Sequence, residues 1–100
     1  MKIKVSPRAK ARIRKEDTWW RENRRDAPDK FKQALANTFL RILKAPAITN
    51  PWAEVDGEPV WRIYMPETRH HLFYTVNHVD AVLVIRAVHG AQQGSPPELG

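Results

Sequence analysis

The sequence predicts an α+β domain of order β-α-α-β-β-β, in which a helical hairpin packs on one face of a mainly antiparallel four-stranded sheet. Three observations indicate this fold class. Two early segments space their apolar residues as helices do. Three later apolar runs are separated by short stretches of turn residues, and a short alternating stretch precedes the first helix. At 100 residues we expect a single domain spanning 1–100, with a flexible tail from about residue 90.

Residues 2–5 alternate polar and apolar side chains, which predicts a short first strand with Ile3 and Val5 facing inward. A helix follows directly. The Ser6 hydroxyl can accept hydrogen bonds from free backbone N–H groups, and Pro7 suits the first helical position, where its missing donor costs nothing.

This first helix is predicted to run from Pro7 to about Asn23. Ala9, Ile13 and Trp20 share one face at helical spacing, so we expect them to be buried. The neighbouring Trp19 points elsewhere, and we expect it to be partly exposed.

The second helix starts in the stretch "RRDAPDKF", where Asp26 or Ala27 is the predicted cap and Pro28 lies in the first turn. It ends just before Pro46, because the residue preceding a proline is disfavoured in helical geometry. The short connection predicts two antiparallel helices. The expected apolar stripe contains Phe31, Leu35, Phe39 and Leu43, flanked by Ala34, Thr38 and Ile42.

Residues 45–59 hold three prolines and a glycine without a sustained period, which predicts a loop. Three apolar runs then predict an antiparallel meander: Val60–Met65, His70–Val76 and Ala81–Val88. We expect the first strand to complete the sheet beside this meander.

The meander strands are apolar on both faces, although the helices can cover only one. Strict alternation places Trp61, Ile63 and Met65 on one face of their strand and Val60, Arg62 and Tyr64 on its other face. In the last strand it places Leu83, Ile85 and Ala87 on one face and Val82, Val84, Arg86 and Val88 on the other. The uncovered face is therefore predicted to be an interaction surface. A packed tail or a homodimer is the alternative explanation.

The net charge of +6 is concentrated in the first half of the chain. Residues 1–45 carry 14 Lys/Arg against 5 Asp/Glu, whereas residues 46–100 carry 3 against 6. This basicity favours attraction to nucleic acid or an acidic protein. The alternative is that the Lys and Arg side chains only form the solvated faces of two amphipathic helices. The chain has no cysteine and no apolar run long enough to span a bilayer, so we expect a cytoplasmic protein without membrane contact.

No phosphate-binding glycine loop, zinc-ligand array or nucleophile elbow occurs, so we expect no cofactor and no metal. Cleavage of RNA through its 2′-hydroxyl needs a base, an acid and a phosphate clamp, and His89 and Arg62 offer two of these roles. The alternative is that His89 only forms structural hydrogen bonds at the end of the strand. Strict alternation also places His89 on the other face of the strand from Arg86, unless the strand bulges or ends near Val88.

The segments "VSPRAKARI", "WWRENRRDAPDKFKQALANTFLRILKAP", "VWRIYM", "RHHLFYTV" and "VLVIRAVHG" together resemble the RelE/ParE superfamily of toxins from type II toxin–antitoxin systems. The resemblance covers nearly the whole chain. It implies a toxin that a cognate antitoxin holds inactive. The target would be DNA gyrase, as for ParE-like members, or messenger RNA on the ribosome, which RelE-like members cut.

We favour gyrase, because RelE has lysines ahead of its second strand whereas "NPWAEVDGEPVW" offers only acidic residues at this place. The chain also departs from the ParE-like pattern, because many ParE-like members carry basic residues after the last strand and "HGAQQG" has none. A non-toxic basic module that binds nucleic acid is a further alternative.

If the chain is instead a metal-independent ribonuclease, a scheme found within the superfamily implies Arg62 as phosphate clamp, His89 as acid, and His71 or Glu54 as base or orienter. For contacts with a target or an antitoxin we select cationic and aromatic side chains of the sheet and the first helix. These are Arg62, Tyr64, Arg86, Lys10, Arg14 and Lys15.

Overall fold

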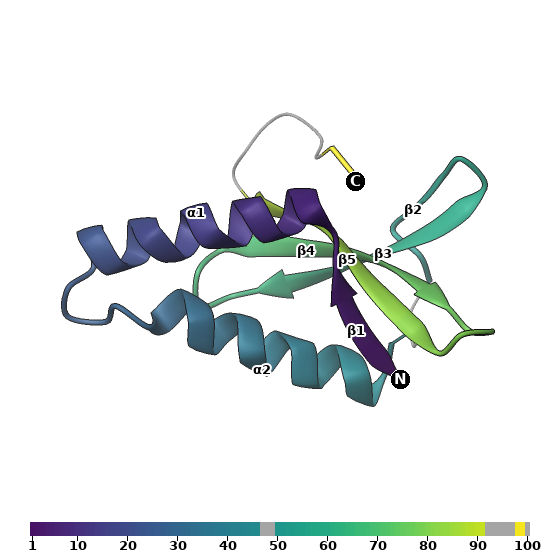
Figure 1. Cartoon of the computed structure of the whole chain (residues 1–100), viewed down its shortest axis with the longest axis horizontal. Coiled ribbons are helices and arrows are strands. Elements are labelled where there is room, and N and C mark those ends of the chain that lie inside the picture. The colour runs from purple at the N-terminus through teal and green to yellow at the C-terminus, as the bar shows by residue number, and fades with distance from the viewer. Residues whose placement is uncertain (47–49, 92–97, 100) are drawn as a thin grey trace.

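The computed structural model describes residues 1–46, 50–91 and 98–99. Along the chain the elements are β1 (Lys2–Val5), α1 (Pro7–Asn23), α2 (Lys30–Lys44), β2 (Ala53–Val55), β3 (Glu58–Met65), β4 (His70–Asn77) and β5 (Val82–Gly90). The strands form one sheet in the order β1-β5-β4-β3-β2, and the antiparallel helices pack against it (Figure 1). The predicted α+β fold class is confirmed.

β1 joins the sheet through a parallel pairing with β5, whereas the other neighbouring strands pair antiparallel. Ile3 lies opposite Leu83 and Val5 lies opposite Ile85. Both β1 side chains pack against the main hydrophobic core. The prediction that the first strand completes the sheet with these two residues inward is therefore confirmed.

α1 begins and ends where the sequence predicts. Its cap is Ser6, whose Oγ accepts a hydrogen bond from the backbone N–H of Ala9 at 3.2 Å. Ala9 is fully buried, and Ile13 and Trp20 pack against the main core. Trp19 is 45% exposed, so the predicted division between the two tryptophans is also confirmed.

α2 begins later than predicted, because the connection after α1 forms turns in which the Ala27 N–H donates to the carbonyl of Arg24 and the Lys30 N–H donates to the carbonyl of Ala27. Its cap is Asp29 rather than Asp26 or Ala27, and Pro28 precedes the helix instead of lying in its first turn. Asp29 makes no side-chain capping bond. Its carboxylate instead pairs with the guanidinium of Arg21 on α1 at 2.9 Å.

α2 ends at Lys44, before Pro46 as predicted, but its buried stripe is narrower than predicted. The side chains buried on this helix are Phe31, Ala34, Leu35, Thr38 and Ile42. Leu43 is 39% exposed, so its predicted place in the stripe is wrong. A strict spacing of four residues drifts around a helix of about 3.6 residues per turn, and Leu43 has turned away from the core.

The sheet has five strands rather than the predicted four, because part of the predicted loop over residues 45–59 forms β2. Asp56 and Gly57 connect β2 to β3 with φ angles of 52° and 78°. A two-residue hairpin turn of type I′ needs positive φ at both positions, and Asp-Gly is its strong sequence signal. This hairpin projects from the rest of the sheet (Figure 1).

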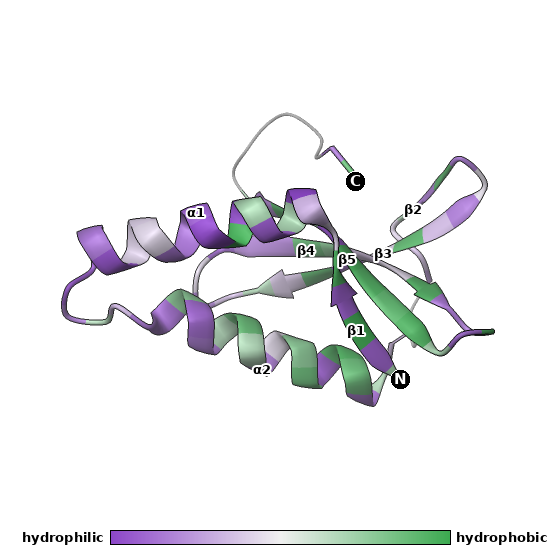
Figure 2. Cartoon of the chain, in the orientation of Figure 1, coloured by the Kyte–Doolittle hydropathy of each residue, from purple (hydrophilic) through white to green (hydrophobic). Residues whose placement is uncertain are grey.

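The main core lies between the helices and the sheet. Its most completely buried large side chains are Phe31, Ile42, Met65, Leu72, Leu83 and Ile85. β5 is hydrophobic over the part that pairs with β1 (Figure 2). Neither described helix is long and apolar enough to cross a membrane.

The other face of the sheet carries a second cluster of Val60, Phe73 and Ala87. Leu99, near the C-terminus, packs against it. This contact agrees with the packed-tail explanation for an apolar second face. The predicted flexible tail falls mostly on residues 92–97 and 100, which lie outside the described residues.

Candidate functional site

The sheet face turned away from the helices carries four side chains that we call the open-face cluster: Arg62, Tyr64, His71 and His89. Tyr64 of β3 lies opposite His71 of β4, which in turn lies opposite His89 of β5. Residues directly opposite each other share a face, and Arg62 shares it with Tyr64 by alternation. Four of the predicted site residues therefore meet on one surface.

A β-bulge in β5 makes this arrangement possible. Tyr74 of β4 pairs with Ile85, but the preceding Phe73 pairs with Ala87. Arg86 is thus an extra residue in β5, and the alternation of its side chains shifts by one position beyond Ile85.

The shift corrects the predicted sides of Ala87 and Val88. Ala87 packs in the second cluster and Val88 packs in the main core, opposite to strict alternation. His89 consequently lies on the open face. Strict alternation would have placed it on the other face, and a bulge was the predicted exception. Arg86 itself donates from Nε to Oγ1 of Thr75 at 3.1 Å and is partly buried.

His71 lies partly buried between two other basic side chains of the cluster. Partial burial lowers the pKa of its imidazole, and the nearby charges of Arg62 and His89 lower it further. The ring lies 5.2 Å from that of Tyr64, and its buried Nδ1 has no hydrogen-bond partner among the described residues. The lowered pKa favours the neutral imidazole near pH 7, which is the form that accepts a proton.

Arg62 lies beside an aromatic residue that the sequence reasoning missed. Its guanidinium carbon is 5.9 Å from the ring centre of Trp52, which precedes β2. The Trp52 ring also meets Phe73 edge-on at 4.8 Å. Trp52 is 39% exposed and Tyr64 is 42% exposed, so the surface combines a cation with accessible aromatic rings. A tryptophan within the proline-containing segment 45–59, which was predicted to be a loop, was the available signal.

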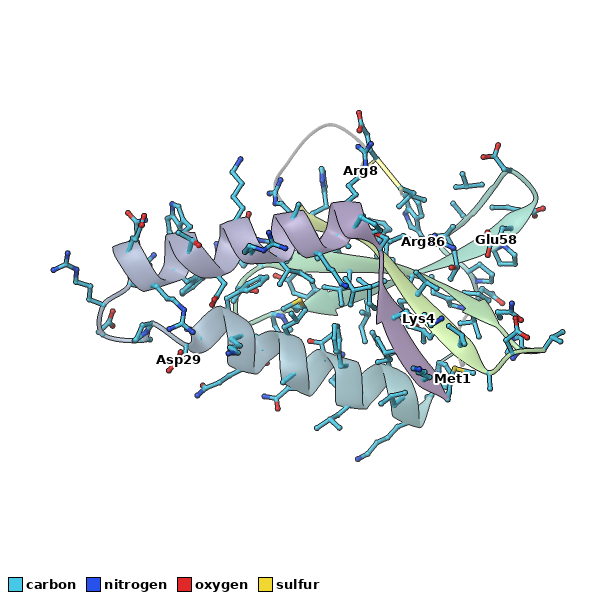
Figure 3. All side chains as sticks on the ribbon, in the orientation of Figure 1. Met1, Lys4, Arg8, Asp29, Glu58 and Arg86 are labelled. Atoms are coloured by element: carbon cyan, nitrogen blue, oxygen red, sulfur yellow. The ribbon has the colours of Figure 1, made fainter. Side chains whose placement is uncertain are left out.

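Glu54 does not join this cluster. It lies on β2 opposite Pro59, whereas the adjacent Ala53 lies opposite Val60 of the second cluster. Glu54 therefore points to the other face of the hairpin from Arg62. It is exposed on the projecting β2–β3 hairpin, whose Glu58 is labelled in Figure 3.

His89 also borders a small pocket of 200 Å³ formed with the start of α1. Arg8 and Arg12 line this pocket together with Glu98 from the C-terminal end. The carboxylate of Glu98 pairs with the guanidinium of Arg8, which lies beside the end of the chain in Figure 3. Sequence reasoning selected neither arginine as a site residue, because their proximity to His89 depends on the bulge and on the packing of α1.

The predicted basic residues of α1 lie in two other places. Lys10 and Arg14 border a largely apolar groove of 390 Å³ between α1 and α2, which Ile13 and Phe39 also line. Lys15 lines a separate pocket near the end of the helix. None of the three lines the small pocket beside His89.

His70 lies on the helix side of the sheet, so the prediction that the two adjacent histidines straddle the sheet is confirmed. Its Nε2 is 3.2 Å from Glu16 Oε2 on α1, and its Nδ1 is 3.0 Å from Thr68 Oγ1. Its ring meets Phe31 edge-on at 5.4 Å. The hydrogen bond from His70 lowers the pKa of Glu16 against the opposing effect of burial.

The described ranges 1–46, 50–91 and 98–99 contain no candidate metal site, because no three His, Asp or Glu side chains lie close enough together there to hold an ion. The chemistry available to the open-face cluster is hydrogen bonding, cation and aromatic contact, and proton transfer.

Comparison with known proteins adds one finding about the family. The family model described as "ParE toxin of type II toxin-antitoxin system, parDE" matches residues 3–94, which is nearly the whole chain. No curated protein and no solved structure matches.

Proposed function

Because the chain belongs to the ParE toxin family of type II toxin–antitoxin systems, we propose that it arrests growth in the cytoplasm by poisoning DNA gyrase. The family implies a cognate antitoxin as partner, and we propose that this antitoxin neutralises the toxin. The family match over residues 3–94 is the observation that carries the proposal.

The open face supports a role in binding. Arg62 and Tyr64 are exposed, and Trp52 adds an aromatic ring beside the arginine. Interfaces between proteins are enriched in such aromatic and arginine side chains. Glu54, a candidate base or orienter of the ribonuclease scheme, points away from this surface. The segment before β3 contains no lysine, so it does not supply the lysines that RelE has at this place.

Controlled expression in a bacterial host tests this proposal. We expect induction to arrest growth with DNA breaks and an SOS response, and co-expression of the neighbouring open reading frame to restore growth. Arg62→Ala should weaken the arrest, whereas the matched control Arg25→Ala, an exposed arginine in the α1–α2 connection, should not. Normal growth at verified protein levels would contradict the proposal.

Cleavage of messenger RNA on the ribosome is the second candidate, favoured by the meeting of Arg62, His71 and His89. In that reaction His71 takes the proton of a 2′-hydroxyl, whose oxygen attacks the neighbouring phosphorus. Arg62 holds the phosphate oxygens, and His89 protonates the departing 5′-oxygen. The products are a 2′,3′-cyclic phosphate and a free 5′-hydroxyl.

Substitution of His89 separates the two candidates. Loss of a general acid costs about 10²–10⁴-fold in rate, so His89→Ala abolishes toxicity if the chain is a ribonuclease. A gyrase poison that works by binding keeps its toxicity in this variant. Loss of toxicity on neutralising Lys10, Arg14 and Lys15 would also indicate a binding poison, acting through the helical face.

A further inference from the structure

A pocket of 710 Å³ lies where α1 ends and α2 begins, next to the β3–β4 turn. Figure 1 shows this turn at the same end of the molecule as the α1–α2 connection. The volume falls within the range of about 300–1,000 Å³ typical of small-molecule sites. The pocket includes the helix-side residue His70, so it is separate from the open-face cluster.

Unpaired cations surround this pocket. Three segments of the chain supply them, and they are Lys15 of α1, Arg24 and Lys30 at the two ends of the helix connection, and Arg69 of the β3–β4 turn. In the part of the chain that the structure describes, none of them forms an ion pair.

The acidic lining offsets this charge only in part. Asp26 and Glu67 also line the pocket, and the third carboxylate, Glu16, is already held by Arg12 and His70. The four unpaired cations therefore exceed the two remaining carboxylates, which favours an anionic ligand.

Two tryptophans add an aromatic wall. The Arg24 guanidinium carbon and the Lys30 ammonium each lie 5.8 Å from the Trp20 ring centre. Trp19 meets Trp20 edge-on at 5.7 Å and is itself 45% exposed. Its accessible ring can stack on a planar base while the cations hold a phosphate.

Hydrogen bonds fix the β3–β4 turn that lines one side of the pocket. His70 is bonded to Thr68 and Glu16, which connects the β3–β4 turn to α1. Arg69 has a φ of 59°, an uncommon conformation for a residue other than glycine. Its backbone N–H donates to the carbonyl of Met65 and its carbonyl accepts from the N–H of Ala91, both at 2.9 Å. These two bonds hold the backbone of Arg69 in this conformation, and such strained backbone positions are common at functional sites.

We propose that this pocket binds a nucleoside phosphate, with the phosphate on Lys15 and Arg69 and the base on Trp19. The nucleotide can be free or part of a single strand, since both present the same chemistry. An acidic peptide is the less suitable occupant, because the cations gather around one hollow with an exposed aromatic ring. The site does not depend on whether gyrase is the target.

Calorimetric titration of the full chain tests the site, with thymidine monophosphate as the free nucleotide and 5′-phosphorylated pentathymidylate as the strand. Lys15→Ala and Arg69→Asn should each weaken binding about tenfold or more, because each removes a charged hydrogen bond to phosphate. Asparagine tolerates the positive φ at residue 69. Lys4→Ala on β1 and Lys44→Ala at the end of α2 remove the same charge at exposed positions outside the pocket and should change affinity by less than about twofold.

Trp19→Ala should weaken nucleotide binding and leave the binding of inorganic phosphate unchanged. Equal affinity for the two probes would identify a free nucleotide, and a clear preference for pentathymidylate would identify a strand. The proposal fails if neither probe binds at millimolar concentration, or if the control variants lose as much affinity as the pocket variants. It also fails if a polyglutamate peptide binds this pocket more tightly than either probe. Matching circular dichroism spectra confirm that each variant is folded.

Discussion

Truncation of Glu16 should destabilise the connection between α1 and the sheet. Its carboxylate accepts a hydrogen bond from Arg12 Nε at 2.9 Å and lies 3.2 Å from Nε2 of His70. The two side chains of the Glu16–His70 pair are only 17% and 8% exposed. Glu16→Ala therefore removes a bond between partly buried groups and leaves a histidine nitrogen without its partner.

The magnitude follows from these contacts. A hydrogen bond to a charged group contributes about 1.5–3 kcal/mol, and a partly exposed pair four residues apart on a helix adds about 0.3–0.5 kcal/mol. We expect Glu16→Ala to lower the free energy of unfolding by about 2–3 kcal/mol. For a domain of this size, that change lowers Tm by about 8–24 °C.

The stabilisation by Glu16 should depend on pH. Because folding lowers the pKa of Glu16 below its ordinary value of 4.5, its contribution is complete above pH 4.5 and is lost as the pH falls through the folded-state pKa. Glu16→Gln keeps the shape of the side chain and removes the charge. Its deficit relative to the wild type should therefore be present at pH 7 and shrink below pH 4.5.

Urea denaturation followed by circular dichroism measures both effects. The exposed Glu22 on the same helix is the control, and Glu22→Ala should change stability by less than about 0.5 kcal/mol. The reasoning would be refuted if Glu16→Ala were as mild as this control, or if the deficit of Glu16→Gln stayed constant from pH 7 to below pH 4.5.

Three further predictions concern the sheet. Leu72→Ala should cost about 2–5 kcal/mol in urea denaturation, whereas the 61% exposed Leu40 should tolerate alanine. Gly57→Ala should cost about 1–2 kcal/mol through its positive φ and speed amide exchange in β2; unchanged exchange would contradict this. Because the pKa of His71 is lowered, wild-type stability should fall as the pH drops below 6.5, and His71→Asn should flatten that slope.

Local rules were sufficient for much of the fold. The cap at Ser6 and the proline at residue 46 set helix boundaries by chemistry that acts within a few residues, and both boundaries were predicted correctly. β2 was missed although Asp56 and Gly57 carry the signal for its turn, because the surrounding prolines favoured a loop. The late start of α2 is accompanied by the Asp29–Arg21 pair, a contact between two elements that sequence spacing does not reveal.

The candidate site was predictable in its residue types and only partly in its geometry. Arg62, Tyr64 and His71 share a face by the regular alternation of paired strands. The place of His89 depends on the extra residue Arg86, and nothing within β5 alone indicates which position bulges. The approach of Trp52 to Arg62 is a tertiary contact between separate segments, which local patterns do not encode.

A cleavage assay with purified gyrase tests the proposed function most directly. Supercoiled plasmid is incubated with gyrase, ATP and the protein, and covalent gyrase–DNA complexes are then trapped with detergent and digested with protease. We expect linear DNA to increase with the concentration of the protein, and to do so equally with His89→Ala. The account would be contradicted if no linear DNA formed at concentrations at which ribosome-bound messenger RNA is cut and His89→Ala abolishes the cutting.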